Sequence, residues 1–481
     1  MKEKVFAGTV WNTINLIGTK SFQFLVQLLL TRMLTPEHYG LVGMAVVFTN
    51  IISVFSEMGV ASALVRIPGH EVKDITLDTA FIASIAFNML TYIVVAIGVG
   101  PLAAWFYDEP VLKQIIPVIG LSIIFNTVTQ IPRVLFIRQL DFKRLSLIQI
   151  FPLIFAGLTA ILMAYNGLGV WSLIANSLLG SLFSIPAFWS QIKWRPKIRF
   201  SKLELKEILA FGIFDSLQSG LITITKNIDY LIIGRLVGSG AVGYYNLAFV
   251  LTDAFRQQIM GIFASVMFPV YSKLQSDLPA IKRYYLAIVQ VNTIIVSGIM
   301  IIFICFADDL IRLFFGAEWI LSAFPLRMMA IASIIHSIGG TSSGVLRGMG
   351  KAKIDFKLSS YNTFFVAIPG FLVLTYFYGI NGTSIAVVIQ KLSERILYQF
   401  YLNEVIGLTL MEMFRSVWLV MVSTFIAMGF YFLVIAGLKQ DNLITLCISM
   451  SAVVLTYSVC AAIFFRGLLM TLLRDKNLML K

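Results

Sequence analysis

The sequence predicts an all-α protein that crosses a membrane many times. Three observations indicate this fold class. Hydrophobic residues make up 58% of the 481 residues and charged residues only 13%, about half of the roughly 25% that soluble domains carry. Apolar runs of roughly twenty residues, the length that crosses a bilayer as a helix, recur along the chain. A segment near residue 30 is repeated in the second half, which predicts two related helical bundles.

The apolar runs are long and continuous, so they favour helices over the ten-residue alternation of a membrane barrel. Hydropathy predicts about fourteen transmembrane helices. The first begins near the N-terminus, where no small-residue cleavage site follows, so we expect a retained helix and not a removed signal. The expected spans are 11–34, 40–63, 78–106, 112–132, 146–165, 169–190, 207–236, 241–269, 284–306, 319–346, 358–378, 383–402, 414–437 and 443–465.

The basic residues of the loops support this helix count. When the loops are assigned alternately to two sides, one side holds nearly all of the loop Lys and Arg, and the other side holds only Arg312 and Lys439. The positive-inside rule therefore predicts that both termini are cytoplasmic. The net charge of +13 follows mostly from this bias. Membrane lipids are expected partners of these charges, and nucleic acid is not, because no binding motif accompanies them.

No cofactor or metal is expected. The three cysteines, Cys305, Cys447 and Cys460, are widely spaced and give neither a disulfide framework nor a metal-binding pattern. The phosphate-binding motif G-x-x-x-x-G-K-[ST] of ATP-driven transporters does not occur in the sequence.

A basic linker, "QIKWRPKIRFSKLELKE" (191–207), follows the sixth expected helix and contains Pro196. The longest inside loop of the chain is the natural boundary between the two halves. The expected organisation is an N-terminal six-helix bundle (1–192), a cytoplasmic linker (193–206), a second six-helix bundle (207–403), and two extra helices with a cytoplasmic tail (404–481).

The internal repeat fixes how the halves correspond. "LLLTRMLTPEHYGLVGMAVV" (29–48) aligns with "LIIGRLVGSGAVGYYNLAFV" (231–250), so that Arg32 falls on Arg235 and Gly40 on Gly243. "LDFKRLS" (140–146) aligns with "IDFKLSS" (354–360). Because six helices separate the copies, both begin on the same side, and the repeat is parallel, with an axis along the membrane normal.

Charged side chains within the hydrocarbon cost about 2.5 kcal/mol or more at a helix centre, so they face a cavity or a partner. Polar residues at helical spacing form stripes on the first, second, seventh and eighth expected helices. The repeat places Gln23 at the position of Lys226, and Asn50 at that of Asp253. These stripes are expected to line a common cleft. The alternative is that acids and bases three or four residues apart, such as Asp253 and Arg256, neutralise each other within one helix.

The opening segment resembles a known family. The pattern Leu-Thr-Arg-x-Leu-x-Pro-x-x-Tyr-Gly at 30–40, followed by an acidic-Met-Gly stretch that closes the second expected helix, is similar to Wzx-type flippases of lipid-linked oligosaccharides. These form the polysaccharide-transporter branch of the MOP superfamily, and the resemblance is to WzxC-like colanic-acid exporters. It implies a MATE-like fold and no enzymatic activity.

The resemblance implies a function in which undecaprenyl-diphosphate-linked oligosaccharide crosses the bacterial inner membrane by alternating access, for exopolysaccharide, capsule or O-antigen synthesis. Cationic and amide side chains would bind its diphosphate and sugars, with Lys20 the first candidate because no acid lies at helical spacing from it. The candidate substrate-binding residues are Lys20, Gln23, Gln27, Asn50, Lys226, Arg256 and Arg327.

Two further groups of residues are expected to support transport. Buried carboxylates that titrate could couple H⁺ or Na⁺ flow to transport, and permanently paired carboxylates are the alternative for the same residues. The coupling candidates are Glu57, Asp229 and Asp253. The gating candidates at the helix ends are Arg32, Arg235, Arg138, Asp141, Arg347 and Asp355. Polysaccharide assembly proteins are expected partners.

Two alternatives remain open. A drug or cation antiporter of the same superfamily would have an acid-dominated site and usually twelve helices. A membrane polysaccharide polymerase or ligase would need catalytic groups on a sizeable outer loop, and the longest expected outer loop is "FADDLIRLFFGAEW" (306–319).

Overall fold

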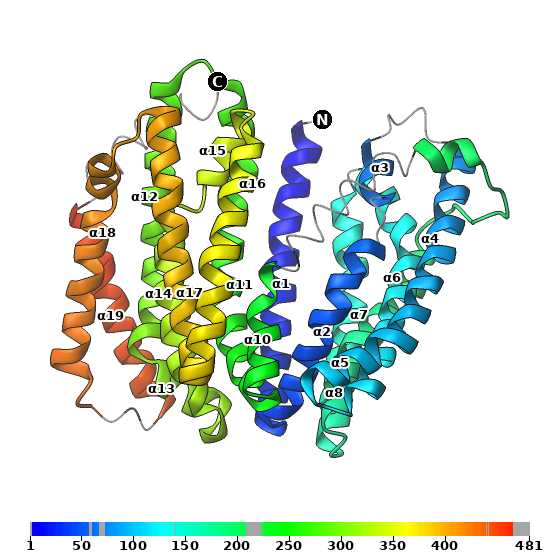
Figure 1. Ribbon diagram of the computed structural model, residues 1–481, viewed down its shortest axis with the longest axis horizontal. Helices are drawn as coiled ribbons and strands as arrows, with labels where there is room; N and C mark the ends of the chain where they lie inside the picture. The colour runs from blue at the N-terminus through cyan, green and yellow to red at the C-terminus, as the bar shows by residue number, and fades with distance from the viewer. Residues whose placement is uncertain are drawn as a thin grey trace. The chain divides into compact units, whose positions relative to one another are not determined.

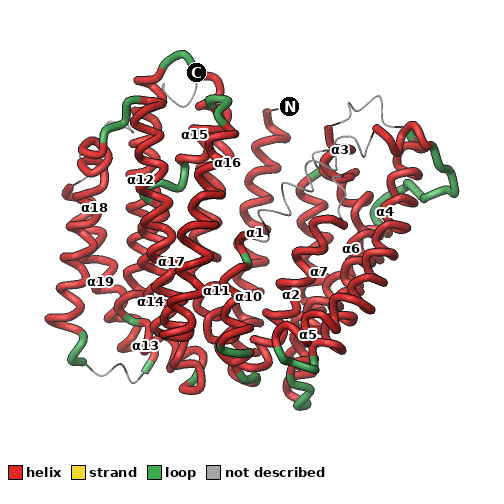
Figure 2. Tube along the Cα trace, viewed as in Figure 1, coloured by secondary structure: helices red, strands yellow, loops and turns green. Residues whose placement is uncertain are grey.

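The computed structural model describes residues 2–56, 60–66, 73–139, 141–207, 223, 225–438, 440 and 442–464. All regular elements of these residues are helices (Figures 1 and 2). The predicted all-α fold class is confirmed. Nine stretches of the described residues are long and apolar enough to cross a membrane. One of them, Ala352–Ile406, spans 55 residues and contains two helices, because Gly379 interrupts it with non-helical dihedral angles.

The chain forms two compact units, residues 1–243 and 244–481. In the first unit, α7 packs on α1 and α8, while α6 packs on α2, α4 and α8. Short α10 packs on α2 and α5. The helices named in the first unit are α1 (Lys2–Met33), α2 (Pro36–Ser56), α3 (Val60–Arg66), α4 (Asp74–Val94), α5 (Gly100–Tyr107), α6 (Leu112–Arg138), α7 (Phe142–Tyr165), α8 (Val170–Trp189) and α10 (Ile228–Leu236), with the π-helix η1 (Val95–Val99) between α4 and α5.

In the second unit, α14 packs on α12 and α17, and α18 packs on α12 and α19. The helices are α11 (Ser239–Lys273, which starts in the first unit), α12 (Leu278–Cys305), α13 (Ala307–Leu310), η2 (Ile311–Phe315), η3 (Ala317–Ser322), α14 (Ala323–Ser337), α15 (Ser342–Gly348), α16 (Ala352–Tyr361), η4 (Asn362–Ala367), α17 (Ile368–Ile406), α18 (Leu410–Phe430), η5 (Tyr431–Ile435) and α19 (Leu443–Phe464).

Most expected spans coincide with helical segments, and the span 112–132 ends too early because α6 continues to Arg138. Residues 57–59 of the span 40–63, and 208–222 and 224 of the span 207–236, lie outside the described residues. The boundaries predicted for the two bundles at 206 and 207 adjoin this gap, and they stay a prediction. The sixteen residues 191–206 lead from α8 towards it, and their backbone is held by α4: Lys197 N–H donates to Asp78 Oδ1 (3.1 Å), and Ser201 N–H donates to Thr79 Oγ1 (3.1 Å).

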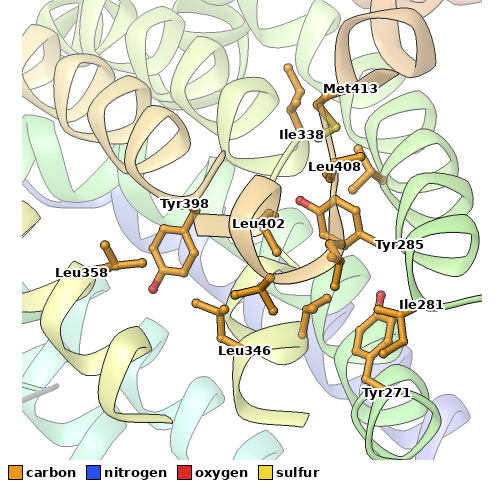
Figure 3. Packing of buried hydrophobic residues seen from close by; sticks show 14 of the residues in the cluster. Tyr271, Ile281, Tyr285, Ile338, Leu346, Leu358, Tyr398, Leu402, Leu408 and Met413 are labelled. Carbon is orange, nitrogen blue, oxygen red and sulfur yellow. The ribbon is translucent and has the colours of Figure 1, made fainter. Parts of the chain in front are cut away.

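A core cluster in the second unit joins α11, α12, α15, α16, α17 and α18 (Figure 3). Figure 3 shows the rings of Tyr285 and Tyr398 on either side of Leu402. All three residues are buried. This core fixes the neighbouring ends of α15 and α17, which carry most of the charged groups described below.

The repeat extends to backbone conformation. Gly169, the N-cap of α8, has φ 53° and ψ −127°, and Gly379, inside α17, has φ 57° and ψ −139°. This combination is accessible essentially to glycine alone. Each glycine precedes the sixth helix of its half, which aligns the two helices with an offset of 210 residues (379 against 169).

Candidate functional site

The first unit contains a polar cavity of about 670 Å³. Most of its lining comes from α2, α4, α6 and α8, with α3 at one edge. The volume falls within the range of roughly 300–1,000 Å³ of small-molecule sites. Its polar lining residues are Thr49, Asn50, Ser53, Asn88, Ser122, Asn126, Thr127, Gln130, Arg133, Ser177 and Ser181.

Helix α6 supplies one polar face to this cavity. Ser122, Asn126, Gln130 and Arg133 follow one another at steps of four, four and three residues, so they lie on one side of the helix. The sequence-based prediction did not include this stripe, because three of its four residues carry no formal charge, although their spacing can be read from the sequence. The pair Ser177 and Ser181 on α8 is a second stripe of the same kind.

Arg133 was predicted to lie in a loop after a helix that ended at residue 132, and this boundary is wrong. Helix α6 continues through Pro132 to Arg138. Proline lacks the N–H that would bond the carbonyl four residues earlier, which is that of Val128. The indole Nε1–H of Trp189 donates to this carbonyl (3.2 Å) and replaces the missing donor. The continued helix places Arg133 in the cavity lining, with its guanidinium carbon 5.8 Å from the centre of the Phe188 ring.

The lining is uncharged except for Arg133 among the described residues, and none of these is acidic. Amides and hydroxyls offer both donors and acceptors, which matches a solute rich in hydroxyl groups. A guanidinium can bind a phosphate oxygen pair through two parallel hydrogen bonds. The arrangement therefore suits a polyhydroxylated ligand that carries a phosphate group.

The second unit has a smaller cavity of about 30 Å³ with charged walls, enough for a few water-sized groups at most. On α17, Lys391 Nζ donates to Glu394 Oε2 at 2.7 Å. His336 of α14 lies with Nδ1 4.0 Å from the same carboxylate oxygen. Arg395 donates to the Tyr285 hydroxyl at 3.1 Å and to Ser342 Oγ at 3.3 Å.

The predicted substrate-binding residues are spread over both units. Asn50 lines the first-unit cavity. On α1, Lys20 and Gln23 are exposed and Gln27 is half-buried. The first of these, Lys20, is not among the described residues that line the cavity.

The remaining substrate candidates lie nearer the second half of the chain. Lys226 is exposed just before α10. Arg256 donates to Asp253, three residues earlier on α11. Arg327 of α14 pairs with Asp308 of α13 and donates to the carbonyl of Ile304 (3.3 Å).

The coupling candidates have different surroundings. Asp253 accepts hydrogen bonds from Arg256 and Gln257 on its own helix, so the pairing that spacing allowed is formed. Asp229 is buried, and its Oδ1 accepts the N–H of Tyr230 (2.9 Å). Glu57 lies outside the described residues.

Three gating candidates of the first unit bind backbone groups, and one of them also pairs with a neighbouring arginine. Arg235 Nη1 donates to the carbonyl of Phe106 (2.8 Å), and Arg138 donates to the carbonyl of Leu64. Asp141 caps α7 by accepting the N–H of Arg144 (3.2 Å) and pairs with its side chain. Arg32 is exposed at the end of α1.

The gating pair of the second unit is part of a network. Arg347 Nε donates to Asp355 Oδ2 (2.6 Å), and Ser343 Oγ donates to the same oxygen (2.9 Å). The hydroxyl of Tyr398 donates to Asp355 Oδ1 (2.6 Å). Three helices, α15, α16 and α17, are thereby joined through one buried carboxylate.

Comparison with known proteins decides the family. A protein-family profile described as "Polysaccharide biosynthesis protein" matches residues 29–325. The chain belongs to this polysaccharide biosynthesis family. The match begins within the segment from which the sequence predicted the relationship, and the prediction is confirmed.

Three relatives of the chain are each named for the biosynthesis of a polymer. The lipopolysaccharide biosynthesis protein WzxC of Escherichia coli is 22% identical over 433 residues, covering 87% of this chain and 85% of the relative. The teichuronic acid biosynthesis protein TuaB of Bacillus subtilis is 26% identical, with 74% and 73% covered. The succinoglycan biosynthesis transport protein ExoT of Rhizobium meliloti is 23% identical, with 72% and 69% covered.

Solved structures show the fold. The lipid II flippase MurJ in an inward closed conformation matches with a TM-score of 0.75 at 15% identity, covering 96% of this chain and all of that one. An inward-facing multidrug-resistance MATE transporter of the MOP superfamily matches with a TM-score of 0.66 at 17% identity, with 80% and 94% covered. The polysaccharide biosynthesis protein therefore has the expected MOP fold. The nine membrane-length helices of its described residues agree with a multi-pass membrane protein, as predicted.

Proposed function

We propose that the protein moves a polyprenyl-diphosphate-linked oligosaccharide across the bacterial inner membrane by alternating access, for assembly of an exopolysaccharide, capsule or O-antigen. The observation that supports this function most directly is the first-unit cavity, which is large, polar and free of acidic side chains among its described lining residues. The family and the named relatives agree with it.

The cavity chemistry fits the polar part of such a lipid. Sugar hydroxyls both donate and accept hydrogen bonds, so Asn50, Asn126 and Gln130 can bind them without requiring one glycan. Arg133 is a diphosphate ligand in this proposal, beside Lys20, Lys226 and the other residues predicted from the sequence. The polyprenyl tail remains in the surrounding lipid, where its apolar surface costs nothing to expose.

Orientation, energy source and partners are also part of the proposal. The loop charges support cytoplasmic termini, and H⁺ or Na⁺ is the proposed coupling ion. The helix-end groups Arg32, Arg235, Arg138 and Asp141, with Arg347 and Asp355, are proposed to hold the two faces of the bundles open or closed. Polysaccharide assembly proteins are proposed to receive the exported lipid-linked glycan.

The alternative of a MATE-like drug or cation antiporter is kept because that family shares the fold. An organic cation would need a carboxylate or a π-face to replace its water. The described lining of the large cavity instead contains a cation, Arg133, and no acid. This observation favours the phosphate-bearing glycan lipid.

The test is reconstitution of the purified protein into proteoliposomes with a fluorescent undecaprenyl-diphosphate oligosaccharide on the inner leaflet. A glycosidase added outside cleaves only molecules that have crossed. We expect faster cleavage than in protein-free vesicles. If the vesicles accumulate a cationic dye yet never expose the diphosphate-linked glycan, the antiporter function replaces the proposed one.

A further inference from the structure

Some lining residues of the two cavities, and residues next to them on the same helices, occupy equivalent places in the repeat. The "DFK" match aligns residue 141 with 355, and the same offset of 214 places Ser122 on His336. The glycine match of 169 with 379 places Ser181 on Lys391 and Ser184 on Glu394. These positions lie on α6 and α8 in the first unit and on α14 and α17 in the second unit.

The second helix of each half shows the same kind of replacement at equivalent positions. The Arg32–Arg235 match, with an offset of 203, places Asn50 on Asp253 and Ser53 on Arg256. On three equivalent helices, neutral hydroxyl and amide groups in the first unit are therefore replaced by ionisable groups in the second unit. Equivalent positions of the repeat therefore differ in charge between the two units.

The ionisable groups of the second unit meet in one cluster. His336 is faced from α17 by Lys391, Glu394, Arg395 and Tyr398, from α15 by Ser342 and Ser343, and from α12 by Tyr285, which bonds Arg395. From α11, Arg256, paired with Asp253, interacts electrostatically with both His336 and Glu394. The side chains of His336 and Glu394 are 18% and 28% exposed, so solvent screens them only in part.

The charge balance of this cluster depends on His336. Three cations, Lys391, Arg395 and Arg256, stand against two carboxylates, Glu394 and Asp253, so the cluster carries one net positive charge when the imidazole is neutral. The carboxylate of Glu394 is held by Lys391 at 2.7 Å, while His336 Nδ1 stands 4.0 Å away. A protonated His336 would repel the ammonium group of Lys391 strongly in this partly desolvated site. Protonation of His336 therefore requires a rearrangement of the side chains.

We propose that His336 and Glu394 form a proton site that couples the second unit to transport. A proton from water binds the imidazole, and the imidazolium N–H approaches Glu394 to hydrogen-bonding distance. The carboxylate then exchanges its partner Lys391 for His336, and the ammonium group of Lys391 is released towards the cavity. Loss of the proton restores the Lys391–Glu394 pair.

This proton site rests on the proposed function and assigns a separate role in transport to each unit. The first-unit cavity, whose described lining is hydroxyl- and amide-rich with the single cation Arg133, binds the glycan and its diphosphate, and the equivalent place in the second unit binds the driving ion. A proton fits this place better than a metal cation, since the imidazole of His336 offers a basic nitrogen, whereas each described carboxylate of the cluster already has a basic partner. The exchange of partners provides the two discrete arrangements that coupling requires.

The proton site can be tested without transport. The chain has three histidines, so ¹⁵N-histidine labelling gives few NMR signals, and His336→Gln assigns the one of interest. We expect the His336 signal to change with pH as the imidazole binds and releases its proton. Lys391→Met and Glu394→Gln, which remove charges of opposite sign, should move its titration midpoint in opposite directions. The signal of His38, on α2 in the first unit, is the internal reference in both variants. A His336 signal that does not titrate, or that ignores both substitutions, overturns the proposal.

Transport provides the second readout. In the vesicle assay, an imposed proton gradient should accelerate crossing by the wild type and by His38→Gln, whereas for His336→Gln the ratio of rates with and without the gradient should fall to one. Crossing without a gradient should persist in His336→Gln, which shows that the variant is folded. If no protein moves the glycan lipid, the proposed function fails while the titration still decides the proton site. If His336→Gln keeps its response to the gradient, coupling through His336 is rejected.

Discussion

Gly40 of α2 and Gly243 of α11 occupy equivalent positions of the repeat, and each lies against the start of the other's helix. A Cβ on Gly40 would stand 1.7 Å from the carbonyl oxygen of Ser239, and a Cβ on Gly243 would stand 1.9 Å from that of Pro36. Ser239 is itself the repeat equivalent of Pro36. The contact, which lies within the first unit, is thus two-fold symmetric, as a parallel repeat predicts. The glycines recur because only hydrogen fits there.

Gly40→Ala and Gly243→Ala should each lower the yield and the thermal stability of the purified protein. The added methyl group meets backbone, which cannot rotate away, so the cost should reach or exceed the roughly 1–3 kcal/mol of ordinary overpacking. Thermal unfolding in detergent, followed by size-exclusion chromatography, measures it. Gly98→Ala is the matched control, because a Cβ there meets no atom within 4 Å. Equal stability of all three variants would contradict the close contact.

Asp355→Asn should destabilise the second unit, whereas the repeat-equivalent Asp141→Asn should have a small effect. Asp355 is 3% exposed and accepts bonds from Arg347, Ser343 and Tyr398. Hydrogen bonds to a charged group contribute about 1.5–3 kcal/mol each. Asp141 only caps α7 beside an exposed arginine, a role worth about 0.5–2 kcal/mol. Unfolding midpoints of the two variants provide the comparison, and a larger loss for Asp141→Asn would refute the difference in their networks.

Gly379→Ala should be destabilising although the added methyl group has space. No atom lies within 4 Å of a Cβ at this position, but φ is +57°. The strain of placing an L-residue in such a region is about 1–3 kcal/mol. Gly429→Ala, inside α18 and equally open, should be neutral or slightly stabilising, because alanine favours helix. Thermal unfolding distinguishes the two variants, and similar midpoints would mean that the glycine conformation is not required.

Arg133→Ala should slow glycan-lipid crossing without lowering the amount of protein in the membrane. The substitution removes the formal charge of the cavity's described lining but leaves the apolar contacts of α6 in place. Arg133→Lys should restore crossing only in part, since an ammonium cannot form the two parallel bonds of a guanidinium. Arg195→Ala, at an exposed arginine of the 191–206 segment, is the control. Unchanged rates in Arg133→Ala would remove this residue from the substrate site.

Much of the architecture was predictable because membrane helices are specified locally. Long apolar runs, alternating loop charges and the repeated Arg–Gly spacing predict the helices, their direction and the two related halves. Helix ends were less predictable. Pro132 indicates a helix end by its chemistry, and only the indole of Trp189, which reaches the carbonyl of Val128 from 61 residues away, lets α6 continue.

The contacts of the candidate sites were also predictable only in part. Spacing alone predicts the Asp253–Arg256 and Lys391–Glu394 pairs, since their members are one helical turn apart. Spacing cannot bring His336 to Glu394 or Tyr398 to Asp355, because those contacts join separate helices.

The sequence by itself determined that this chain is a helical membrane protein with an internal repeat, since hydrophobicity and charge act residue by residue and leave a readable pattern. Only the tertiary structure decided which polar faces share a cavity. Packing between helices rotates each one about its axis. This rotation brings Asn50, Asn126 and Gln130 together with Arg133 in one cavity, and His336 and Glu394 together in a charged cluster.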